Sequence, residues 1–76
     1  MSKNLYDLSV GEKGIIKKVE AARTIKERLH SFGLIRGVEI TPVGRAPLGC
    51  PRIYNCLNSQ VSIRNNIAKQ IQIYEE

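Results

Sequence analysis

The sequence predicts a small, mainly β protein in which about five short strands close into a barrel and one α-helix follows the first strand. Short stretches in which apolar and polar residues alternate recur along the chain, and turn-forming residues separate them. A single segment carries apolar residues at helical spacing. With 76 residues, the chain has the size of one domain, residues 1–76, and room for only a small core. A deep catalytic cleft is hard to form around such a core, so the length argues against an enzyme.

The first strand is predicted over residues 14–20, GIIKKVE, because β-branched residues are prominent in this stretch. Lys17 and Lys18 lie within it, and we expect them to leave one face of the strand in water. Ahead of the strand, Leu5 and Leu8 predict a short turn or helical cap that packs on the core.

The one helix is predicted over residues 24–32. Thr24 and Glu27 have the spacing of a capping box, in which two side chains each accept a hydrogen bond from a free backbone N–H group. Three apolar residues at i, i+4 and i+7 predict a single face turned to the core: Ile25, Leu29 and Phe32. Gly33 then has the position of a left-handed helix end, and Leu34 is expected to fold back on the last turn as in a Schellman motif.

Four further strands are predicted by alternation, near residues 38–43, 53–57, 60–64 and 71–73. Arg36 and Gly37 form a turn before the first of these strands. Asn58 and Ser59 are expected to make a tight turn, because asparagine tolerates a positive φ. The polar stretch at residues 65–70 predicts one helical turn.

The stretch RAPLGCPR, residues 45–52, predicts a stiff arch between the second and third barrel strands. Its prolines and its glycine set the shape of the backbone, and an arginine stands at each foot. Cys50 is expected to be exposed in this loop. Cys56 alternates with Tyr54 on the following strand and is predicted to be a small core residue.

The net charge is +5, and no acidic residue lies between residues 40 and 74. A basic surface favours acidic partners, which are nucleic acids, anionic membranes or acidic protein faces. Barrels that bind single-stranded nucleic acid stack bases on aromatic side chains, and this chain has three tyrosines, one phenylalanine and no tryptophan. The composition therefore argues against nucleic acid as the main partner.

No arrangement of catalytic or metal-ligating residues is evident. A structural zinc ion needs four ligands, and the chain offers two cysteines at C-x5-C spacing and one histidine, His30. There is no glycine-rich phosphate-binding motif. The sequence thus predicts no active site, no resident metal and no cofactor, although a metal or a disulfide that joins two chains through Cys50 stays open. The N-terminal stretch has no apolar signal core, which predicts a cytoplasmic protein.

Three blocks in order, RLHSFGLIRGVEI, RAPLGCPRIYN and VSIRNNIAKQIQIY, resemble the FeoA family of bacterial ferrous iron transport. The matching positions are Arg28, Leu29, Gly33, Leu34 and Gly37 in the first block, Ala46, Pro47, Gly49 and Pro51 in the second, and Ile63, Arg64, Ala68 and Ile71 in the third. The resemblance covers nearly the whole chain. It departs at Cys50, where the family often has aspartate, and at Asn58, where it often has glycine.

The resemblance implies an SH3-like barrel and a non-enzymatic role in ferrous iron uptake. The implied partner is FeoB, a membrane iron permease with a cytoplasmic GTPase domain, which would bring this chain to the inner membrane. A weak homo-oligomer is left open. The residues expected to be free for a partner lie in the Leu34–Gly37 turn and in the arch: Ile35, Arg36, Arg45, Leu48 and Arg52. Two alternatives stay open, a basic nucleic-acid-binding barrel and a small transition-metal-binding or metal-sensing domain.

Overall fold

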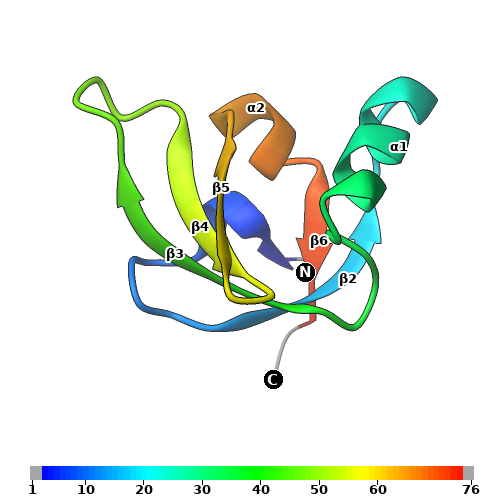
Figure 1. Ribbon diagram of the computed structural model, residues 1–76, viewed down its shortest axis with the longest axis horizontal. Helices are drawn as coiled ribbons and strands as arrows, with labels where there is room; N and C mark the ends of the chain where they lie inside the picture. Colours follow the sequence, from blue (N-terminus) through cyan, green and yellow to red (C-terminus); the bar gives the residue numbers. More distant parts are fainter. Residues whose placement is uncertain (1–2, 75–76) are drawn as a thin grey trace.

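The computed structural model describes residues 3–74, which form six strands and three helical segments around one core (Figure 1). The strands are β1 (Lys3–Asn4), β2 (Gly14–Val19), β3 (Glu39–Arg45), β4 (Arg52–Cys56), β5 (Ser59–Ile63) and β6 (Ile71–Ile73). The helical segments are the 3-10 turn η1 (Leu5–Asp7) and the α-helices α1 (Arg23–Ser31) and α2 (Asn65–Ala68). The mainly β fold with a helix after the first long strand is confirmed. The sixth strand is the two-residue β1, which is too short to show any alternation.

All neighbouring strands are antiparallel, in the order β1-β6-β2-β3-β4-β5. Strand β2 joins the two halves of this sheet: its first residues pair with β3 and its last residues pair with β6. The sheet therefore curves, and η1 and α2 lie between its two halves (Figure 1). Thirteen apolar residues are buried between them: Leu5, Leu8, Ile16, Val19, Leu29, Leu34, Ile40, Tyr54, Cys56, Ile63, Ala68, Ile71 and Ile73.

The curve in the sheet brings the backbone at Gly14 close to side chains from both ends of the chain. A Cβ atom at this position would lie 2.8 Å from Leu8 Cδ1 and 2.9 Å from Ile73 Cγ2. Both distances are shorter than real Cβ contacts. Only glycine therefore fits at this corner without moving the core.

Helix α1 is confirmed, but its predicted N-terminus is wrong. The N-cap is Ala22, which makes no side-chain capping bond, and Thr24 lies inside the first turn. Glu27 instead accepts a hydrogen bond from Arg23 Nε at 3.2 Å, one turn back along the helix. The capping box of this chain is at η1, where Asn4 and Asp7 make both reciprocal bonds.

The C-terminal end of α1 has the predicted Schellman geometry. The N–H of Gly33, which has a φ of +87°, donates to His30 O, and the N–H of Leu34 donates to Leu29 O, each at 3.0 Å. Leu34 is fully buried as a result. The expectation that Phe32 packs in the core is wrong, since its side chain is 58% exposed. The helix ends before it, and the turn directs Leu34 inward in its place.

The tight turn between β4 and β5 lies one residue earlier than predicted. Cys56 pairs with Ser59, so Leu57 and Asn58 form the two-residue loop. Both have positive φ values, 52° and 62°, as the hairpin turn that matches strand twist requires.

Candidate functional site

The five residues predicted to meet a partner lie on two separate surfaces. Ile35 and Arg36 are in the turn between α1 and β3, and both are exposed. Arg45, Leu48 and Arg52 lie at the other end of β3, in and beside the arch. The seven residues of β3 span roughly 20 Å, and Figure 1 shows the turn and the arch at opposite ends of this strand. The structure therefore does not bring the two loops together.

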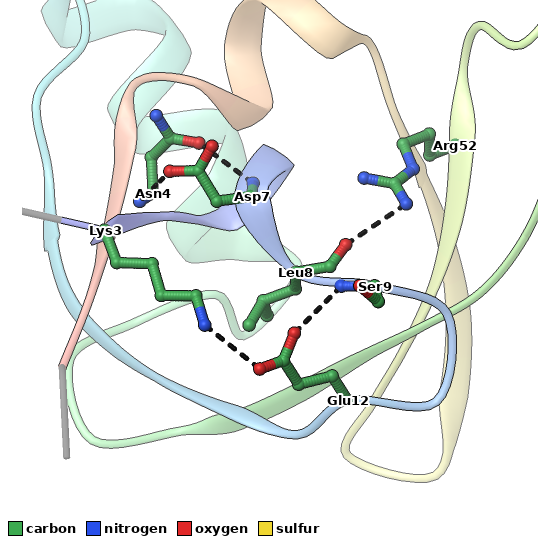
Figure 2. Close-up of polar contacts among 7 residues, drawn as sticks. All are labelled: Lys3, Asn4, Asp7, Leu8, Ser9, Glu12 and Arg52. Atoms are coloured by element: carbon green, nitrogen blue, oxygen red, sulfur yellow. Dashed lines mark hydrogen bonds and ion pairs between the residues drawn. The ribbon is translucent and has the colours of Figure 1, made fainter.

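The prediction that Arg52 is free to contact a partner is wrong, because its side chain is buried, with 9% of the residue exposed. Its Nη1 donates to Tyr6 O at 2.9 Å. Its Nη2 donates to Leu8 O at 3.2 Å (Figure 2). The guanidinium also lies 5.3 Å from the centre of the Tyr6 ring. Arg52 thus fastens the N-terminal segment to β4. Its inward direction depends on pairing between distant strands, which the sequence pattern does not show.

A second set of bonds closes the same N-terminal segment (Figure 2). Glu12 accepts from Ser9 N at 2.9 Å and from Lys3 Nζ at 3.0 Å. These two donors hold the pKa of the Glu12 carboxyl below its usual range. Asn4 and Asp7 bond each other's backbone N–H groups at 3.1 and 3.2 Å. The capping-box spacing at these residues is a sequence signal that could have located η1.

The arch itself is held by bonds within the chain and presents Leu48 at its tip. Ala46 N donates to Pro51 O at 3.0 Å, and Gly49 N donates to Ala46 O at 2.8 Å. Asn65 Nδ2 reaches Gly49 O at 3.1 Å and so joins the arch to α2. Leu48 is 96% exposed. The arch is therefore a supported loop with one apolar side chain in water.

The cysteines lie where the sequence predicted: Cys50 is exposed in the arch and Cys56 is buried in the core. Burial raises the pKa of the Cys56 thiol, which keeps it protonated and unreactive. Within residues 3–74, no group of three or more His, Cys, Asp or Glu side chains could hold a metal ion together.

A groove of 580 Å³ lies between α1, β2 and the turn that follows the helix. We call it the basic groove, and its lining residues are Lys17, Lys18, Val19, Lys26, His30, Ile35 and Arg36. It contains two of the predicted partner residues, Ile35 and Arg36. Its three lysines and its histidine come from β2 and α1: Lys17, Lys18, Lys26 and His30. Sequence reasoning did not assign these four residues to a site.

A β-bulge directs both lysines of β2 outward. Ile16 pairs with Ile73 and Lys18 pairs with Gln72, so Lys17 is an extra residue on its strand. Without the bulge, neighbouring residues would point to opposite faces of the sheet. With it, Lys17 and Lys18 are both exposed, while Ile16 and Val19 are both buried. The IKKV order, with two polar residues between two core residues in a strand, is the signal that could have revealed it.

Tyr74 fixes two of the groove's cations. Its hydroxyl accepts a hydrogen bond from Arg36 Nε at 3.1 Å. Lys17 Nζ lies 6.0 Å from the centre of its ring, at the limit of a cation–π contact. Both cations therefore have a preferred position before any ligand arrives.

The family model of the FeoA domain matches residues 3–75. The chain belongs to the FeoA family. An Fe(2+) transport protein A/Fe(2+) transporter FeoB fusion protein of Porphyromonas gingivalis is 32% identical to this FeoA chain over 69 residues. That match covers 91% of this chain but only 8% of the fusion protein, so the chain spans a small part of that relative.

Solved FeoA structures share the fold. The FeoA protein of Chlorobium tepidum is 30% identical with a TM-score of 0.89, and the match covers 95% of this chain and 69% of that one. Iron(II) transport protein A of Clostridium thermocellum is 31% identical with a TM-score of 0.87, covering 93% of this chain and 44% of that one. A Stenotrophomonas maltophilia FeoA complexed with zinc, described as an SH3 domain protein, is 23% identical with a TM-score of 0.79, over 97% of this chain and 89% of that one. The SH3-like fold is confirmed.

The FeoA family takes part in ferrous iron transport, as an accessory domain of the transport system. Among residues 3–74 of this FeoA chain, no helix has the length and apolar character needed to cross a membrane.

Proposed function

We propose that this FeoA chain is a non-enzymatic accessory protein of ferrous iron uptake that binds the cytoplasmic GTPase region of a FeoB-type permease. The observation that carries the proposal is the Porphyromonas gingivalis protein that joins an FeoA-like part and an FeoB transporter in one chain. A covalent link holds two parts at a high effective concentration, on the order of millimolar for a short flexible linker. A separate FeoA chain needs a binding surface to reach the same proximity. The proposal places the chain in the cytoplasm, at the inner membrane when bound.

Two exposed surfaces are available for this contact. One is the basic groove with Ile35 and Arg36, and the other is the arch with Arg45 and Leu48. Arg52 is not part of either, because it is committed to the carbonyls of Tyr6 and Leu8.

The test uses the full-length FeoB-type permease of the same genome in nanodiscs of zwitterionic lipid. Binding of the labelled chain is measured by fluorescence anisotropy, and GTP hydrolysis is measured with and without it. We expect saturable binding in the micromolar range or tighter. Empty nanodiscs control for lipid. No binding to the loaded nanodiscs and an unchanged rate of hydrolysis would together refute the proposal.

A further inference from the structure

The basic groove concentrates positive charge without a compensating carboxylate. It is lined by four of the chain's 12 lysines and arginines, and no Asp or Glu lines it among residues 3–74. Outside the groove, three cations are held by oxygen atoms of the chain: Lys3 pairs with Glu12, Arg23 pairs with Glu27, and Arg52 binds two carbonyls. Gathering like charges around a concave surface disfavours the folded state and attracts anions. The groove is therefore complementary to a negatively charged ligand.

The bottom of the groove is aliphatic. Val19 is buried at its base, and Ile35 lines it with 45% of its surface still exposed. Burying an exposed isoleucine against a partner's apolar surface favours binding, and Ile35 still has roughly half of its surface to bury. A purely ionic ligand would not use this surface. The groove accordingly suits a ligand with an apolar group between negative charges.

The groove is also built in advance of binding. The bulge at Lys17 places two neighbouring lysines on one face, and Tyr74 positions Arg36 through a hydrogen bond. Lys26 and His30 stand one turn apart on α1, facing these residues across the groove. Side chains that are already placed lose less conformational entropy on binding.

From these observations we propose that the basic groove docks an acidic segment of the partner protein, in which one apolar side chain sits on Ile35 and flanking carboxylates meet Lys17, Lys18, Lys26 and Arg36. The inference rests on the proposed function, since it describes how the permease would be recognised. It names the groove, and not the arch, as the surface that carries specificity.

A protein segment explains the groove better than nucleic acid or lipid does. Bases need aromatic faces for stacking, and the groove floor is aliphatic. A membrane surface is met by a protruding basic or apolar face, whereas these cations surround a hollow. Carboxylates on either side of an apolar residue match both the charged rim and the floor.

The first experiment compares two charge-reversed variants in the nanodisc binding assay. Lys18→Glu/Lys26→Glu alters the groove at two cations with no bonded partner among residues 3–74. Lys13→Glu/Arg64→Glu lowers the net charge by the same four units from +5 at exposed positions outside the groove. We expect the groove variant to weaken binding at least about tenfold at low salt, and the control less than about twofold. The difference in affinity between the two variants should become smaller at about 0.5 M salt, because salt screens the charges.

A second pair of variants tests the apolar floor. Ile35→Asn is expected to weaken binding several-fold, and Leu48→Asn, an equally large change at the exposed tip of the arch, is expected to leave it unchanged. Circular dichroism and thermal unfolding confirm that all variants are folded. If wild type binds and Leu48→Asn alone abolishes binding, the groove inference is overturned while the proposed function stands. An equal loss of binding in the two charge-reversed variants would also overturn the groove inference, because net charge alone would then explain the binding.

A third measurement tests ligand binding by the groove in the absence of the permease. A five-residue peptide, with a central leucine and two glutamates on each side, is titrated into the labelled chain. The chemical shifts of the chain are followed by NMR. We expect shifts at Lys18, Lys26 and Ile35, and none with glutamines in place of the glutamates. This arm decides the inference even if the permease does not bind. The inference is overturned if the shifts fall on the arch, if they are absent, or if single-stranded DNA or phosphatidylglycerol vesicles bind the groove more tightly.

Discussion

The two ends of β3 use basic residues in opposite ways. At the arch end, Arg52 is buried and gives its donors to the backbone of η1 and the residue after it. At the other end, Lys17, Lys18, Lys26 and Arg36 surround a groove and face water. In the sequence these cations look alike. Whether a cation supports the fold or remains available to a partner depends on which unsatisfied backbone groups the fold brings to it.

This difference has a thermodynamic consequence. Removing the cation at the arch end leaves buried carbonyls without donors, so stability should fall. Removing cations at the groove end relieves repulsion, so stability should rise while binding is lost. The effects on stability thus have opposite signs at the two ends.

The largest expected effect is at Arg52. Arg52→Met keeps much of the apolar stem but removes two hydrogen bonds from a charged group, and bonds of this kind contribute about 1.5–3 kcal/mol each. We expect a loss of about 3 kcal/mol in the free energy of unfolding, measured by urea denaturation. Arg45→Met, its exposed cross-strand neighbour, is the control and should stay within about 0.5 kcal/mol of wild type. Equal losses in the two variants would contradict the role of Arg52 in fastening the N-terminal segment to β4.

The sequence predicted the fold well because burial follows alternation. Strands β3 to β6 and helix α1 have apolar residues at the period of their secondary structure, and β2 departs from it only at its bulge. The local sequence pattern does not predict whether a side chain points inward when its direction depends on a segment that is distant in the sequence. Arg52 turns inward because the carbonyls of Tyr6 and Leu8, more than forty positions away, lack other donors beside it.

The candidate site was predicted only in part, for a related reason. Ile35 and Arg36 were predicted as partner residues because they lie in the Leu34–Gly37 turn, and both line the groove. Lys17 and Lys18 were seen as a wet face of the strand, but their shared direction requires the bulge opposite Gln72. Strand β2 and helix α1 line the same groove only in the tertiary fold, and a local sequence pattern does not show this.

Removing the bulge of β2 is the next test of the difference between the two ends of β3. Deleting one of the two lysines, Lys17 or Lys18, leaves Ile16 and Val19 in step with their partners on β6. The strand becomes regular, so the chain should fold with a stability change of about 1 kcal/mol and bind the permease several-fold more weakly. The control is deletion of Val43, the extra residue of the bulge at the arch end of β3. It should leave binding unchanged, and weaker binding in this control would show that the bulges act through overall shape.

A smaller effect of the opposite sign is expected on removing groove charge alone. Lys18→Gln/Lys26→Gln should raise the free energy of unfolding by a few tenths of a kcal/mol at low salt, since repulsion among the groove cations is relieved. The gain should vanish at about 0.5 M salt. Lys3→Gln serves as the matched control, because Lys3 is paired with Glu12 and its loss should slightly lower stability. A fall in stability for the groove variant would mean that these lysines support the fold.

The smallest effect is expected at Glu12, in the N-terminal segment that Arg52 fastens, and it appears as a dependence on pH. Bonds from Ser9 N and Lys3 Nζ hold the pKa of Glu12 below its ordinary value of about 4.3, so the folded state favours the carboxylate. The stabilisation is present above that value and is lost as the pH falls through the lower, folded-state pKa. Glu12→Gln keeps an oxygen for Ser9 N but cannot titrate, so its unfolding midpoint should fall less steeply than that of wild type on acidification. Thermal unfolding between pH 7 and pH 3 measures the difference between the two slopes. Identical slopes would show that the bonds around Glu12 contribute nothing to holding the N-terminal segment. Of these side chains, Arg52 alone would then fasten the N-terminal segment to the sheet.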